Sequence, residues 1–65
     1  STGDTAEDVL AITAVHPMRE DAVAELLQRA GAGWSVIQEL LDRNQLGVVE
    51  YNSQRFYVRR LLKRT

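Results

Sequence analysis

The chain has 65 residues, of which 45% are hydrophobic and 26% are charged, and it contains no cysteine. This length allows one small domain, and the lack of cysteine excludes disulfides and any metal or iron–sulfur cluster held by thiolates of this chain. No apolar stretch is long enough to cross a membrane. We therefore expect a cytoplasmic protein that does not enter a membrane, and we take it to be a monomer.

The charges are distributed unevenly along the chain. The formal net charge is -1, but eight of the nine acidic residues lie within residues 1–42. The end of the chain is basic instead, with Arg55, Arg59, Arg60, Lys63 and Arg64. Such an imbalance marks either a surface for nucleic acid or an acidic partner, or a solvated terminus.

The chain is predicted to begin with a disordered linker over residues 1–6, followed by one domain over residues 7–65. The segment Val9–Val15 is rich in β-branched residues and ends before His16-Pro17. Because the residue before a proline favours extended geometry, this pattern predicts a short strand. A helix from Glu7 to Val15 is the alternative.

A first helix is predicted to start at Pro17, where the missing N–H of proline costs nothing. Glu20 and Asp21 would then lie in its first turn, at the positive end of the helix dipole. Apolar residues recur at helical spacing, namely Val23, Leu26, Leu27 and Ala30. Gly31 is expected to end this helix in a left-handed conformation.

A second helix follows after a tight glycine turn. Its apolar stripe comprises Trp34, Ile37, Leu40 and Leu41. The helix should end near Arg43-Asn44, where asparagine tolerates a positive φ. We expect Trp34 to anchor the core, because so small a domain needs its large side chains inside; an exposed contact residue is the alternative.

Beyond Leu46 the apolar pattern changes to a period of two, which predicts a β-hairpin with a turn at Asn52-Ser53. The turn has two or three residues, so the register stays open, as does the choice between Phe56 and Tyr57 for the core side. One of the three aromatic residues Tyr51, Phe56 and Tyr57 should remain exposed. The predicted fold is α+β, a small winged helix-turn-helix in strand, helix, helix, hairpin order with a three-stranded antiparallel sheet.

No residue pattern supports catalysis by this chain. His16 is the single histidine and is expected to be structural, beside Pro17. The glycines of Gly31-Ala32-Gly33 are explained by a turn, because no Gly-Lys-Ser/Thr sequence follows them. Ser35 and Ser53 have no base to activate them.

A helix-turn-helix usually binds duplex DNA with its second helix in the major groove. The outward residues predicted for that helix here carry two acids and one base, which is a poor surface to bring near phosphates. The predicted hairpin is the wing of such a fold. Together with the C-terminal end it is basic, and these two parts are the better candidates for binding a macromolecule. The residues predicted to contact a macromolecule are Gln38, Arg43, Arg55, Arg59, Arg60 and Lys63.

Three segments resemble a known family: His16–Val23, Trp34–Ile37 and Phe56–Arg59. They are similar to the small winged-helix domain at the C-terminus of a group of radical S-adenosylmethionine iron–sulfur oxidoreductases. Gly33 departs from the polar capping residue expected before the tryptophan.

The resemblance implies a non-catalytic accessory domain of a larger enzyme. That parent would hold a 4Fe–4S cluster and S-adenosylmethionine, and no residue that binds either can be assigned in a chain without cysteine. The expected partner is the parent catalytic domain or another protein. A nucleic-acid-binding winged helix that uses the basic wing and C-terminus is the alternative.

Overall fold

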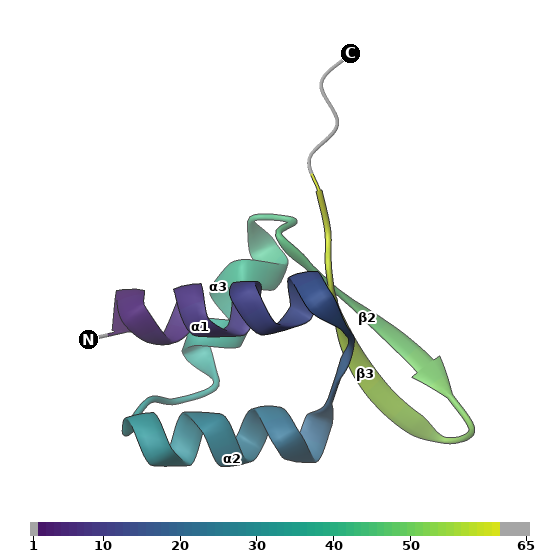
Figure 1. The fold of residues 1–65 in the computed structure, drawn as a ribbon, viewed down its shortest axis with the longest axis horizontal. Helices are drawn as coiled ribbons and strands as arrows, with labels where there is room; N and C mark the ends of the chain where they lie inside the picture. The colour runs from purple at the N-terminus through teal and green to yellow at the C-terminus, as the bar shows by residue number, and fades with distance from the viewer. Residues whose placement is uncertain (1, 62–65) are drawn as a thin grey trace.

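The computed structural model describes the backbone of residues 2–61 and the side chains of residues 4–61. In this part of the chain the elements follow one another as α1 (Thr2–Val15), β1 (Met18–Arg19), α2 (Glu20–Ala30), α3 (Ser35–Asp42), β2 (Leu46–Tyr51) and β3 (Gln54–Arg59) (Figure 1). The helices lie together, and the β2–β3 hairpin projects beyond them (Figure 1).

Helix α1 replaces the strand predicted over Val9–Val15, so that prediction is wrong and its helical alternative is correct. The helix buries a stripe of residues at helical spacing, and two of the three residues in this stripe are polar. Thr5, Val9 and Thr13 lie four residues apart and are all buried, at 4%, 0% and 6% exposure. The Thr13 hydroxyl donates to the Val9 carbonyl at 2.7 Å, which satisfies it inside the helix.

The same helix corrects the disordered linker predicted over residues 1–6, because residues 2–6 belong to α1. Ala6 packs against the core and Thr5 is buried within the fold. A buried face gives this first turn tertiary contacts, which is what most helices in proteins need in order to be stable.

Helix α2 starts at Glu20. The predicted start at Pro17 is therefore wrong. The intervening residues form β1, in which Met18 pairs with Tyr57 and Arg19 with Phe56 of β3. Pairing with the hairpin therefore overrides the helix-start signal of proline. Glu20 and Asp21 do lie in the first turn of α2, as expected.

Both later helices end as the sequence predicts. Gly31 has a φ of 69°, and the N–H groups of Gly31 and Ala32 donate to the carbonyls of Gln28 and Leu27, a pattern known as the Schellman motif. Asn44, with a φ of 65°, ends α3 through the equivalent bonds. A left-handed residue thus ends each helix and reverses the chain.

The hairpin register, left open by the sequence, is settled by a two-residue turn. Tyr51 pairs with Gln54, and Asn52 and Ser53 both have a positive φ, of 53° and 64°. Two central residues of positive φ are typical of the type I′ turn, whose twist matches that of the strands. The sheet is antiparallel, with strand order β1-β3-β2.

The core lies between the helices and one face of the sheet. Tyr57 of β3 is 4% exposed and belongs to it, which decides the choice between Phe56 and Tyr57. The remaining core residues come from all the other elements: Val9, Met18, Val23, Leu27, Val36, Ile37, Leu40 and Leu46. The fold is α+β with a three-stranded antiparallel sheet, as predicted. It is compatible with a small winged helix that has an additional N-terminal helix, α1.

Within the part of the chain that the structure describes, none of the helices is long and apolar enough to span a bilayer.

Candidate interaction surfaces

The described residues hold no group of three or more His, Cys, Asp or Glu side chains that could bind a metal ion. His16 lies exposed just after α1, and its Nδ1 is 3.0 Å from the carbonyl oxygen of Pro17. This bond joins His16 to the next residue of the chain and is therefore local.

Tyr57 is a titratable side chain whose pKa is clearly shifted by the fold. Burial raises the pKa of its phenol above the usual value, the carboxylate of Glu20 raises it further, and the guanidinium of Arg55 opposes them. The folded state therefore holds the phenol proton more tightly than the unfolded state does.

We expect ionisation of the Tyr57 phenol to lower the free energy of unfolding at alkaline pH. Because the folded pKa is raised, the contribution is fully present below the unfolded value of about 10 and is lost as the pH rises through the folded value. The measurement is urea denaturation from pH 8 to pH 11, comparing the parent chain with Tyr57→Phe and with the control Tyr51→Phe. Only Tyr57→Phe should flatten the alkaline loss, and an unchanged loss in that variant would contradict the assignment.

On the exposed side of α3 and at its C-cap, polar side chains bond to one another. Gln38 Nε2 donates to Asp42 Oδ1 at 2.9 Å, and Arg43 Nη2 lies 3.1 Å from Glu39 Oε2. The two residues of this helix predicted to contact a macromolecule are thus paired with the two acids beside them. An arginine paired in this way adds little net positive charge to the surface.

The described arginines of the predicted basic end do not all lie on one face of the sheet. Successive strand side chains point to opposite faces of a sheet, so Arg55 and Arg59 share the core face with Tyr57 while Arg60 continues on the opposite face. The Arg60 stem lies over Gly47, where a Cβ would come within 3.0 Å of Arg60 Cδ. Lys63 and Arg64 lie outside the described residues.

Arg59 makes a contact within the fold. It is half-buried, and its Nη1 donates to the Leu10 carbonyl of α1 at 3.2 Å. Its buried Nε finds no partner among the described residues. The side chain thus joins β3 to α1 across the core.

Replacing Arg59 with alanine should therefore lower the free energy of unfolding by about 1.5 kcal/mol, since a hydrogen bond from a charged donor and the packing of its stem are both lost. The matched control is Arg55→Ala, an exposed arginine on the same strand face, for which we expect a change within about 0.5 kcal/mol. Denaturation with urea measures both. Equal losses would show that the contact with α1 adds no stability.

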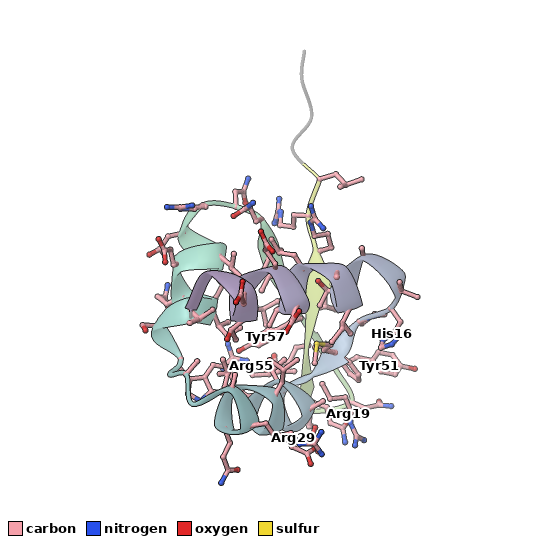
Figure 2. All side chains as sticks on the ribbon, turned by 60° about the vertical axis from the view of Figure 1, so that its left-hand side comes forward. His16, Arg19, Arg29, Tyr51, Arg55 and Tyr57 are labelled. Carbon is pink, nitrogen blue, oxygen red and sulfur yellow. The ribbon has the colours of Figure 1, made fainter. Side chains whose placement is uncertain are left out.

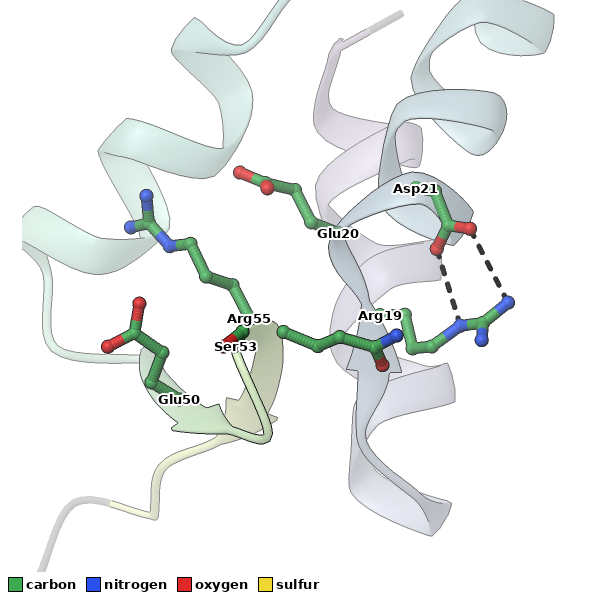
Figure 3. A pocket seen from close by; sticks show the side chains of 7 residues that line it. Arg19, Glu20, Asp21, Glu50, Ser53 and Arg55 are labelled. Atoms are coloured by element: carbon green, nitrogen blue, oxygen red, sulfur yellow. Dashed lines mark hydrogen bonds and ion pairs between the residues drawn. The ribbon is translucent and has the colours of Figure 1, made fainter.

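A pocket of about 300 Å³ lies between the tip of the β2–β3 hairpin and the start of α2, and Figure 3 shows the side chains that line it. Arg55 extends between Glu50 and Glu20, and Arg19 is bonded to Asp21 at 3.4 Å (Figure 3). Three carboxylates and two guanidinium groups leave no excess of positive charge here. The pocket therefore does not resemble a phosphate-binding groove, whose charges share one sign.

The face of the sheet that points away from the helices carries an apolar hollow of about 290 Å³. The surface lining it is apolar throughout, and we call its five residues the outer sheet face: Pro17, Val49, Tyr51, Phe56 and Val58. Tyr51 is 66% exposed and Val49 48%. Figure 2 shows Tyr51 at the side of the molecule while Tyr57 lies among the helices.

Sequence reasoning missed this face, although a signal for it was present. Val48-Val49 and Phe56-Tyr57 are pairs of consecutive apolar residues in strands, so one member of each pair must point away from the core. The expectation that one aromatic residue stays exposed is met by Tyr51.

Trp34 is not the core anchor that the sequence predicts. It is 44% exposed and occupies the N-cap position of α3, while Val36, Ile37 and Leu40 of that helix fill the core. Its ring centroid still lies 6.1 Å from that of Tyr57, at a 42° tilt. The tryptophan thus lies beside the Tyr57 ring at the edge of the core.

Within the described residues, the fold and these surfaces define a small α+β domain that carries an apolar hollow on its sheet. The chain is similar to UPF0026 protein MJ1312 of Methanocaldococcus jannaschii, with 38% identity over 58 residues that cover 89% of this chain. The matched part is 18% of that relative, so the chain spans less than a fifth of its length. No model of a known protein family matches the chain. No solved structure matches it either.

Proposed function

We propose that this chain is a non-catalytic accessory domain of a larger protein, with the chemistry carried by other parts of that protein. The observation that carries the proposal is the match to only 18% of a longer relative. It is supported by the exposed side of α3, where Gln38 bonds to Asp42 and Arg43 pairs with Glu39 within the fold.

The larger protein, we infer, is a radical S-adenosylmethionine iron–sulfur protein of the cytoplasm. This step is supported by the resemblance of His16–Val23, Trp34–Ile37 and Phe56–Arg59 to the winged-helix domain of that family. The residues of this chain do not fit a 4Fe–4S cluster, because the chain has no cysteine. The cluster and S-adenosylmethionine would therefore be bound wholly by residues outside it.

The first test reads the coding sequence on both sides of this chain. A longer reading frame with a Cys-x-x-x-Cys-x-x-Cys motif is expected, and a frame that encodes these residues alone would overturn the proposal. The second test purifies the full polypeptide, with and without this domain, under anaerobic conditions. Iron and acid-labile sulfide per polypeptide should be equal in the two forms, whereas loss of the cluster on deletion would show that the domain takes part in holding it.

Binding to nucleic acid would be a different function, and it has its own test. The ¹⁵N-labelled chain is titrated with duplex DNA, single-stranded DNA and RNA at low and moderate salt. We expect no shifts that weaken with salt. Salt-sensitive shifts clustered at Arg55, Arg60 and the following basic residues would favour the nucleic-acid-binding alternative, because phosphate contacts release counterions.

A further inference from the structure

We propose that the outer sheet face docks onto another part of the same larger polypeptide, on a surface with an apolar centre and a carboxylate at its rim. This inference rests on the proposed function and names the surface that the accessory domain uses.

Among the described residues, helices cover the sheet on one side and none covers the other. Tyr57, Met18 and Leu46 point into the core, where all three helices supply side chains. Phe56 and Val58 alternate with Tyr57 along β3, and Val49 is paired with Phe56, so these residues share the opposite side. Single exposed apolar residues are ordinary, but a contiguous group that lines one hollow marks an interaction site.

Two arginines lie at the edge of that side of the sheet, of which Arg19 is already paired with Asp21. Arg19 pairs with Phe56 and so shares its face, and Arg60 follows Val58 by two residues along the chain. The acid of the hairpin, Glu50, pairs with Arg55 on the core side. An apolar centre with the Arg60 guanidinium at its edge is complementary to a partner that offers a carboxylate beside an apolar centre.

The size of the patch favours a tethered partner over a second copy of this chain. Separate proteins that bind stably use about 20–30 residues on each side, and the outer sheet face has five. A partner on the same polypeptide needs less contact, because a tether supplies an effective concentration of the order of millimolar. The relative has such a polypeptide, since 82% of its length (100% less the matched 18%) lies outside the match.

The test is site-specific photo-crosslinking in the full polypeptide that contains these residues. p-Benzoylphenylalanine replaces Tyr51 on the outer sheet face, or Gln38 on the exposed side of α3 as the matched control. Crosslinks from position 51 to residues outside this chain, within the same molecule, are expected, with few or none from position 38. Mass spectrometry locates the linked residues, which should lie beside Asp or Glu.

A second variant adds Val49→Ser to the probe at position 51, which should lower the crosslink yield about tenfold, equivalent to ~1.4 kcal/mol. Val49 is 48% exposed, so we expect the domain to stay folded, and the fluorescence of Trp34 in the free 65-residue chain carrying Val49→Ser, where it is the single tryptophan, verifies this. Crosslinks mainly from position 38, or between two molecules, would overturn the docking surface while leaving the accessory role intact. A reading frame without any further polypeptide would instead overturn the accessory role itself.

Discussion

Truncating Tyr57 to alanine is expected to unfold most of the domain at 37 °C. The ring is 4% exposed on the central strand, where it pairs with Met18 of β1 and Val48 of β2. Removing a buried aromatic ring costs about 4 kcal/mol, and a core of this size supplies only about 3–5 kcal/mol in total. Tyr57→Ala should therefore leave little or no net stability.

Circular dichroism and the fluorescence of Trp34 measure this loss, since the indole lies 6.1 Å from the Tyr57 ring and is the single tryptophan. Tyr57→Phe keeps the ring and should cost less than about 1.5 kcal/mol. Tyr51→Ala, at a 66% exposed tyrosine of the neighbouring strand, should change stability by no more than about 0.5 kcal/mol. A folded Tyr57→Ala variant with a native melting curve would refute the central place given to this ring.

Ile37→Ala is expected to lower the free energy of unfolding by about 3 kcal/mol. Ile37 is 1% exposed on α3, among core residues contributed by both other helices and the sheet, so the surroundings cannot collapse into the space without moving several elements. The graded variant Ile37→Val should cost about 1 kcal/mol and keeps the measurement possible if the alanine variant does not fold.

Urea denaturation gives both values as shifts of the midpoint at an unchanged slope. The neighbouring Gln38→Ala is the control, because Gln38 is exposed and its bond to Asp42 lies on the surface of the same helix. Losses of similar size at positions 37 and 38 would mean that α3 contributes to stability through helix propensity and not through burial.

Most of the fold could be predicted from the sequence where the side-chain pattern and the local signals agree. Helices α2 and α3 have apolar stripes at helical spacing and end at residues that accept a positive φ, Gly31 and Asn44. The hairpin has a period of two and a polar turn at Asn52-Ser53. Each of these signals acts over a few residues, which is the range that a sequence pattern reports directly.

The errors occur where contacts distant in sequence decide the outcome. The buried stripe of α1 contains Thr5 and Thr13, which a pattern of apolar residues does not count. Met18 lies in a strand because Tyr57, far along the chain, offers it a partner. Local propensity is a weak guide in such places, because tertiary contacts override it.

The placement of the candidate interaction residues also depends on contacts that are distant in sequence. A run of basic residues predicts a charged surface, but strand geometry sends Arg59 to the backbone of α1 and Arg60 to the opposite side of the sheet. The outer sheet face is assembled from Pro17 and two strands, so it becomes visible only once the hairpin register is known.

The strand order leaves β2 at one edge of the sheet, with six residues that include adjacent valines, 39% and 48% exposed. Such an edge can template the addition of a foreign strand, which is how many isolated domains begin to aggregate. Glu50 follows the two valines directly and places a charge where an incoming strand would align. We therefore expect Glu50 to oppose the addition of a further strand, and we expect Glu50→Val to make concentrated solutions of the free domain prone to fibril formation.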